Sequence, residues 1–121
     1  MQPHISEFLR RVVRSAWGLE LLLLMRATQS RSWTSIELSA ELRGSVPLVE
    51  DILGVFVRSQ IVALEDGRRY RYSPAERSTE NLISDLAKMH RDYPLTVVKE
   101  ILRAPNDKIQ SFVDAFRLKQ D

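Results

Sequence analysis

The sequence predicts a mainly α-helical protein that carries one small β-hairpin. Apolar residues recur every three or four positions through most of the 121 residues, which is the spacing of amphipathic helices. The dipeptide Asp66-Gly67, followed by the alternating stretch Arg69 to Tyr72, indicates a single hairpin. A hydrophobic content of 44% is sufficient for a folded core, and the length is that of one ordinary domain.

The composition narrows the class of protein. The net charge of +2 permits a nucleic-acid partner without requiring one, since a small excess says nothing about where the charges cluster. The chain has no cysteine, which excludes disulfides and thiolate zinc sites. The apolar run Leu21 to Met25 is far too short to span a bilayer, and the N-terminus lacks the pattern of a targeting segment. We therefore expect a soluble cytoplasmic protein with no membrane partner.

The first predicted helix covers residues 5–13, where apolar residues face one side and arginines the other. The arginine face is either a solvated basic surface on a docked helix or an arm that contacts phosphates. Ser15 can cap a new helix, and Gly18 lowers helix stability by about 1 kcal/mol, so the chain is expected to bend or restart there. The strongly apolar stretch up to Thr28 predicts a helix buried on most sides at the centre of the domain.

Two short helices separated by a tight turn come next. Thr34 and Glu37 have the spacing of a capping box, which predicts a helix over residues 36–43 that stops at Gly44. Ser45 is expected to cap the second helix. The apolar residues of this second helix recur at helical spacing, which predicts that one of its faces is buried. The residues of that face are Val49, Ile52, Leu53 and Phe56.

Two registers are open for the hairpin. A two-residue loop at Asp66-Gly67 pairs Glu65 with Arg68, whereas a three-residue loop pairs Glu65 with Arg69. We favour the three-residue loop, because it places the apolar side chains on one face and the charged ones on the other. In that register the inward side chains are Val62, Leu64, Tyr70 and Tyr72, and the outward ones are Glu65, Arg69 and Arg71.

Three further helices are predicted after the hairpin. Ser78 is expected to cap a helix whose apolar stripe extends to Tyr93, and Pro94 is expected to break it. A short helix over Leu95 to Arg103 is followed by a turn at residues 104–107. A last amphipathic helix then continues to about residue 119.

The order of elements in the first half of the chain resembles a winged helix-turn-helix domain of bacterial transcriptional regulators. The resemblance implies a short first strand at Trp33-Thr34, a recognition helix over residues 45–59 and a wing over residues 61–73. It implies transcriptional regulation by binding of double-stranded DNA. The chain is then divided into an N-terminal helix (1–14), the winged domain (15–74) and a C-terminal helical extension (75–121).

A DNA-binding interpretation assigns contacts to three kinds of residue. Hydroxyls at helix N-termini hold phosphates, arginines on the wing and at the edges add charge, and side chains of the second helix touch base edges. The second helix departs from this pattern, because Glu50 and Asp51 repel phosphates and its basic residue, Arg58, comes late. The candidate DNA contacts are Arg31, Thr34, Ser35, Arg43, Ser45, Leu48, Asp51, Arg58, Arg68, Arg69 and Arg71.

The same departure favours a second interpretation, a winged-helix protein-interaction module that binds no DNA. An outward face that mixes Val46, Leu48 and Val55 with Glu50 and Asp51 suits a protein partner. Function belongs to sites rather than to folds, so the resemblance alone does not decide between the two interpretations.

The C-terminal helices carry more apolar surface than a winged domain requires. We expect this surface to form a homodimer, together with the N-terminal helix. The alternative is that these helices fold back on their own domain as a cap. The candidate contacts between subunits are Phe8, Leu86, Met89, Val98, Ile101, Ile109, Phe112 and Phe116.

No arrangement of residues in the sequence predicts catalysis. His4 and His90 stand alone, without a second histidine at metal-ligand spacing. Glu50 and Asp51 are neighbours on a helix and point about 100° apart, so they do not form an acid–base pair. The four glycines are scattered singly and form no phosphate loop. We expect no enzymatic activity, no metal and no cofactor.

Overall fold

The structure is a computed structural model that describes residues 2–103 of the chain. Its helices and its three-stranded antiparallel sheet confirm the predicted mainly α class with a small hairpin. Every helix in the described range is too short or too polar to cross a lipid bilayer. The elements are α1 (Pro3–Phe8), the π-helical η1 (Leu9–Val13), α2 (Ala16–Ala27), β1 (Trp33–Thr34), α3 (Ser35–Leu42), α4 (Val46–Arg58), β2 (Val62–Glu65), β3 (Arg69–Tyr72), α5 (Arg77–Asp92) and α6 (Pro94–Arg103).

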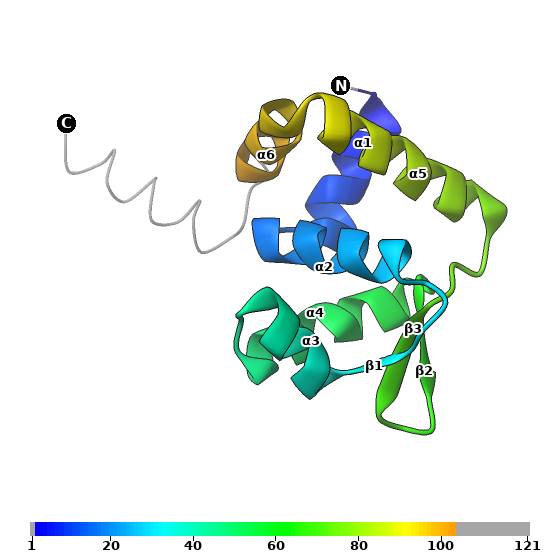
Figure 1. The fold of residues 1–121 in the computed structure, drawn as a ribbon. Helices are drawn as coiled ribbons and strands as arrows, with labels where there is room; N and C mark the ends of the chain where they lie inside the picture. The colour runs from blue at the N-terminus through cyan, green and yellow to red at the C-terminus, as the bar shows by residue number, and fades with distance from the viewer. Residues whose placement is uncertain (1, 104–121) are drawn as a thin grey trace, which may run out of the picture.

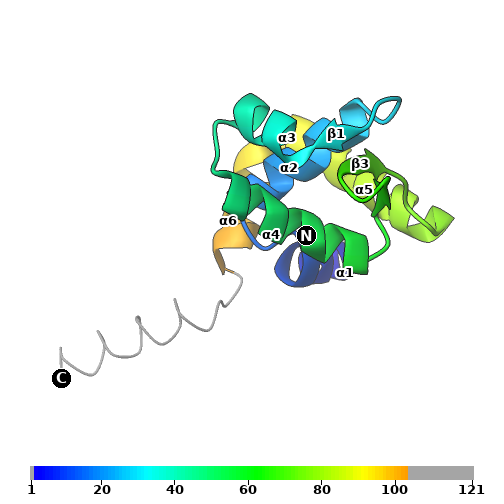
Figure 2. The same ribbon diagram turned by 90° about the horizontal axis from the view of Figure 1, so that it is seen from below.

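Helix α2 lies at the centre of the described structure (Figure 1). The helices α1, η1, α5 and α6 cover one side of it, and α3, α4 and the sheet lie on the other side. Figure 2 shows α4 running close to the N-terminal helices. The side chains of Leu21, Leu22 and Met25 are buried, which confirms the prediction of a buried central helix.

The junction between η1 and α2 is built around Gly18. The π-helical turn ends at Arg14, which adopts a left-handed φ of 69°. Ser15 then caps α2, because its hydroxyl accepts a hydrogen bond from the Gly18 N–H at 3.0 Å. A Cβ on Gly18 would lie 2.1 Å from the carbonyl oxygen of Val13. The chain therefore restarts where the sequence predicts, and only glycine fits in the first turn of the new helix at this position.

One hydrophobic core joins the N-terminal helices to the C-terminal ones. It extends from Ile5 of α1 to Ile101 of α6 and includes the buried face of α4. The predicted segment boundaries after residues 14 and 74 therefore lie within one packed body. The side chains that α4 contributes to this core, as predicted, are Val49, Leu53 and Phe56, with Ile52 half-buried beside them.

The sheet has the strand order β1-β3-β2, and its hairpin has the three-residue-loop register that the sequence favours. Glu65 pairs with Arg69 at the loop end of the hairpin. One predicted inward residue is wrong, since Leu64 is 46% exposed. The hairpin projects beyond the helices (Figure 1), so only its inner end, at Val62 and Tyr72, is buried.

Two predictions for the C-terminal helices are also corrected. Helix α5 begins at Arg77 without a side-chain cap, so Ser78 is not its N-cap. Tyr93 was predicted on the apolar stripe of α5 and is 65% exposed, because α5 ends one residue earlier and Pro94 begins α6 at once. The predicted break at Pro94 is confirmed. The predicted turn at residues 104–107 and the last predicted helix lie outside the described residues.

Candidate nucleic-acid or protein interface

The candidate interface consists of α3, α4 and the hairpin. The Thr34 hydroxyl accepts from the Glu37 N–H at 3.1 Å, and the Glu37 carboxylate accepts from the Thr34 N–H at 2.8 Å. This reciprocal pair confirms the predicted capping box and fixes the start of α3. The Thr34 hydroxyl, a predicted phosphate ligand, thus accepts a hydrogen bond within the chain, and Ser35 beside it is half-buried.

A three-residue turn joins α3 to α4. Helix α3 ends one residue earlier than predicted, because Arg43, not Gly44, takes the left-handed conformation, with a φ of 58°. The Ser39 hydroxyl donates to the Gly44 carbonyl and braces the turn. Ser45 caps α4 as predicted, since its hydroxyl accepts from the Leu48 N–H at 3.2 Å. A second hydroxyl that was predicted to hold phosphate is therefore engaged in a helix cap.

The exposed face of α4 is acidic in its first half and basic only at its end. Glu50 and Asp51 are exposed, whereas Leu48 is half-buried and offers only part of its side chain. Arg58 is exposed in the last turn, and Arg43 is exposed just before the helix begins. The rise of an α-helix separates the two arginines by roughly 20 Å, so they do not form one basic patch.

Glu37 forms ion pairs with two of the arginines that were predicted to contact DNA. Arg31 donates to one carboxylate oxygen at 3.3 Å, and Arg69 donates to the other at 3.4 Å. Arg69 also donates to the Ser32 hydroxyl at 2.9 Å. The Arg31 guanidinium lies 3.5 Å from the ring centroid of Trp33, which is a cation–π contact. The arginines meet at this point because β1 pairs with β3, which brings Arg69 next to the start of α3.

The electrostatics of this cluster favour the ionised carboxylate. The backbone N–H of Thr34 lowers the pKa of Glu37, and the charges of Arg69 and Arg31 lower it further. The buried Trp33 anchors the cluster to the core, since its indole N–H donates to the Thr28 hydroxyl at 3.0 Å. At neutral pH, Arg31 and Arg69 therefore lie beside an ionised carboxylate on their own chain.

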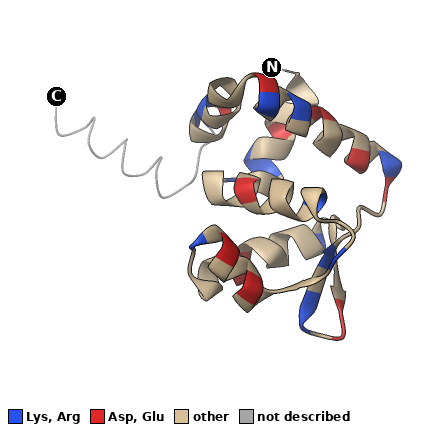
Figure 3. Ribbon diagram, viewed as in Figure 1, with Lys and Arg blue, Asp and Glu red and all other residues tan. Residues whose placement is uncertain are grey.

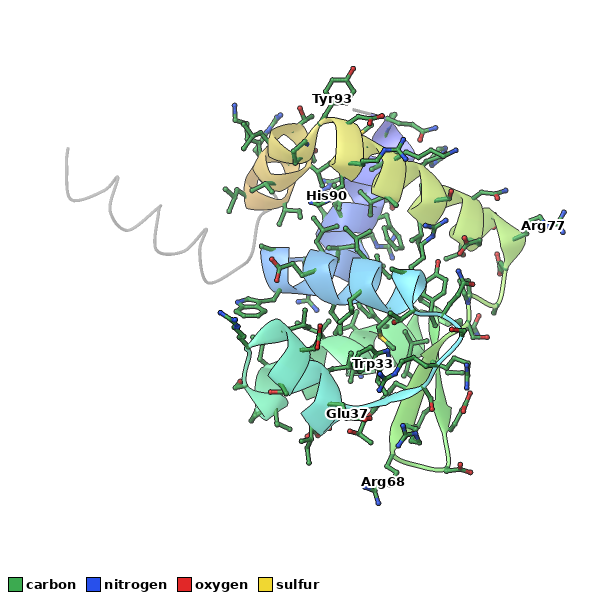
Figure 4. All side chains as sticks on the ribbon, viewed as in Figure 1. Trp33, Glu37, Arg68, Arg77, His90 and Tyr93 are labelled. Carbon is green, nitrogen blue, oxygen red and sulfur yellow. The ribbon has the colours of Figure 1, made fainter. Side chains whose placement is uncertain are left out.

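Of the two remaining hairpin arginines, one forms an ion pair within the hairpin and the other is exposed at its tip. Arg71 donates to the Glu65 carboxylate at 2.8 Å, within the same hairpin. Arg68 is exposed at the tip of the hairpin and points away from the molecule (Figure 4). Within residues 2–103, Arg68 has no ion pair. Figure 3 shows basic and acidic residues together on the hairpin, and acidic residues on α3.

Sequence reasoning missed a second cluster, which links α2, β3 and α5. The Tyr72 hydroxyl donates to the Glu80 carboxylate, and Arg26 donates to the other oxygen of that carboxylate at 3.3 Å. Burial raises the pKa of Tyr72 above its ordinary value, and the hydrogen bond to Glu80 raises it further. The three residues are far apart in the sequence, so no local pattern reveals the contact. The cluster attaches α5 to the sheet.

Several residues that were predicted to form a dimer interface are buried within their own chain. Phe8, Leu86 and Ile101 pack in the core of their own chain, so these three are corrected: a buried side chain presents no surface to a second subunit. Met89 and Val98 are half-buried. Ile109, Phe112 and Phe116 lie outside the described residues. The homodimer itself stays a prediction.

Within residues 2–103, no group of three or more His, Asp and Glu side chains is placed to hold a metal ion.

Comparison with known proteins adds no functional assignment. The chain matches no family model, no curated protein and no solved structure.

Proposed function

We propose that the chain is a winged helix-turn-helix module that binds another protein through α4 and the neighbouring hairpin. The order of elements supports the winged-helix assignment: two helices joined by a three-residue turn are followed by a hairpin that pairs with a short strand before the first of them. The second helix of such a pair exposes one face for recognition.

The arginine pairing is the observation that favours a protein partner. Three of the arginines that could neutralise phosphates, Arg31, Arg69 and Arg71, are paired with carboxylates on the same chain. The carboxylates beside them offset part of their positive charge and would repel a phosphate, so the net electrostatic attraction for DNA is reduced. A mixed apolar and acidic surface also suits a protein partner better than a phosphate backbone.

The acidic residues in the first half of α4 also favour a protein partner over DNA. Glu50 and Asp51 occupy the early turns, from which a recognition helix ordinarily reaches base edges. The half-buried Leu48 leaves part of an apolar side chain beside them, and Pro47 is exposed. The complementary partner surface is basic with apolar side chains at its centre.

Arg68 favours a second candidate function, DNA binding in a transcriptional regulator. It is exposed at the hairpin tip without an ion pair in the described part of the chain. A wing arginine in that position contacts phosphates and contributes affinity without sequence preference. Such binding falls steeply as salt rises.

A mobility-shift experiment on random duplex DNA separates the two functions. At about 50 mM salt, where phosphate contacts are strongest, we expect the wild-type chain to leave the duplex unshifted. The double variant Glu50→Lys/Asp51→Lys should shift the duplex, because it converts the early turns of α4 into a basic surface. A matched double variant on the opposite side of the molecule, Asp85→Lys/Asp92→Lys, changes the net charge equally and should shift it less.

A wild-type shift at low salt would contradict the proposal if Arg68→Ala weakens it and about 200 mM salt abolishes it. That result would assign the chain to DNA through its wing. An equal shift by both charge-reversed variants would show that net charge alone drives binding and that α4 has no special role.

A further inference from the structure

Helix α5 begins with little support from its own residues. It has no side-chain cap, and the side chains of Arg77, Ser78 and Asn81 near its start are exposed. The side chains that α5 buries in the core, Ile83 and Leu86, come later in the helix. The start of α5 therefore needs contacts from other elements to hold it in place.

Glu80 supplies such contacts from the first turn of α5. One oxygen of its carboxylate accepts from two N–H groups of the Arg26 guanidinium, in the last turn of α2, both at 3.3 Å. The other oxygen accepts from the hydroxyl of Tyr72, the last residue of β3. An ionised carboxylate has two acceptor oxygens, so one side chain serves both partners at once.

The base of the hairpin, where β3 leaves the sheet, is the place where this contact matters most. In the described sheet β1 pairs with β3 at Arg69 and Tyr70, whereas Arg71 and Tyr72 pair with β2 alone. Tyr72 is buried, and a buried hydroxyl without a partner is costly. The bond to Glu80 therefore holds β3 at the point where its second strand neighbour is missing.

We propose that Glu80 is a positioning residue that fixes the base of the hairpin against α2 and α5. The hairpin belongs to the candidate interface, whereas Glu80 lies outside it on α5. The hairpin projects beyond the helices (Figure 1), so a small rotation at its base moves its tip by more. Glu80 thus sets the place of Arg68, at the tip, relative to α4. This consequence for binding rests on the proposed function, whereas the fixed base does not.

Two backbone hydrogen bonds report directly on the base of the hairpin. The Ser73 N–H donates to the Ile61 carbonyl at 2.8 Å, and the Ala75 N–H donates to the Gln60 carbonyl at 2.9 Å. Both bonds lie within three residues of Tyr72 in the chain. Release of Tyr72 should therefore open them before the rest of the fold opens.

Native-state hydrogen exchange of the full chain, followed amide by amide by NMR, tests the proposal without any partner. In Glu80→Ala we expect the amides of Ser73 and Ala75 to exchange several-fold faster than in the wild type. The Gly44 amide, which donates to the Ser39 carbonyl at 3.1 Å between α3 and α4, should accelerate much less. A general loss of stability would accelerate all three amides equally.

Two further variants separate the hydrogen bond from the loss of charge. Tyr72→Phe keeps the buried ring and removes the hydroxyl, so it should accelerate the same two amides. Combined with Glu80→Ala it should add nothing, since both substitutions remove one bond. Asp85→Asn is the matched control: Asp85 is exposed on the same helix and has no ion pair within residues 2–103. It should exchange like the wild type.

Three outcomes would overturn the proposal. They are unchanged rates at Ser73 and Ala75 in Glu80→Ala, equal acceleration at Gly44, and additive effects of Glu80→Ala and Tyr72→Phe. A duplex shift by the wild-type chain would instead contradict the proposed function and leave the positioning of the hairpin intact.

Discussion

At the scale of single residues, Glu37 determines the charge that the candidate interface presents. Its carboxylate serves the cap of α3 and also receives Arg31 and Arg69 from two other elements. An ionised carboxylate at a helix N-terminus is stabilised by the backbone N–H groups there. The same group therefore holds the helix start in place and offsets one of the two positive charges beside it.

The lowered pKa of Glu37 predicts a pH dependence of stability. The ionised carboxylate stabilises the fold at pH values above the ordinary value of 4.5, and this contribution is lost as pH falls through the lowered folded-state value. Glu37→Gln should therefore reduce the free energy of unfolding at neutral pH, with the difference from the wild type shrinking below 4.5. Urea unfolding at a series of pH values measures the difference.

Glu41→Gln is the control for this prediction, because Glu41 is exposed on the same helix and has no ion pair in the described part of the chain. It should leave the free energy of unfolding close to that of the wild type at every pH. A Glu37→Gln deficit that persists undiminished in acid would show that the ionised carboxylate contributes nothing.

At the scale of elements, the turn between η1 and α2 depends on the absence of a side chain. Replacing a glycine within a helix by alanine ordinarily stabilises it by about 1 kcal/mol. At Gly18 the added Cβ would lie 2.1 Å from a backbone oxygen, so the sign reverses. We expect Gly18→Ala to destabilise the protein by about 2 kcal/mol or more, measured by urea unfolding.

Gly54 of α4 provides the opposite case. There the nearest atom to an added Cβ is the end of the flexible Arg58 side chain, at 3.2 Å, which can move aside. Gly54→Ala should therefore stabilise the protein by up to about 1 kcal/mol. Stabilisation by both substitutions would refute the close approach at Gly18.

At the scale of the whole molecule, the continuous core couples the N-terminal helices to α6. Ile5 and Ile101 belong to one buried cluster that also includes Phe56 of α4. A domain of this size with one core unfolds in a single cooperative transition. The helices outside the predicted winged domain therefore contribute to its free energy of unfolding.

Substitutions at the two ends of the core test this coupling. Ile5→Ala and Ile101→Ala should each lower the free energy of unfolding by about 2–4 kcal/mol, because each leaves a cavity. In both variants, circular dichroism and tryptophan fluorescence should report the same midpoint in urea. Separate transitions for the two signals would show that the ends fold independently of the part that contains α3, α4 and the sheet.

Local interactions explain which parts of the fold the sequence predicts correctly. The capping box at Thr34, the cap at Ser45 and the restart at Ser15 each involve residues within three or four positions of one another. The register of the hairpin follows from the alternation of apolar and charged residues in a short stretch. Such patterns are readable because both partners lie in the same window of sequence.

Contacts between residues far apart in the chain explain which parts of the candidate site the sequence does not predict. The arginines near the hairpin look like free positive charge in the sequence, and the pairing of β1 with β3 brings Arg69 to Glu37. The burial of Phe8 and Leu86 likewise depends on which helices come together. An apolar stripe shows that a helix face seeks cover without showing whether its own chain or a second one supplies it.

Within the described residues, the sequence by itself determined most of the helices, the caps at Ser15, Thr34 and Ser45 and the paired strands, because these form from interactions between near neighbours. Tertiary structure decided which charges stay available and which apolar faces stay exposed, because ion pairing and burial depend on contacts between residues dozens of positions apart. That is why the order of elements was predictable from the sequence, whereas the pairing of Arg31, Arg69 and Arg71 with carboxylates was not.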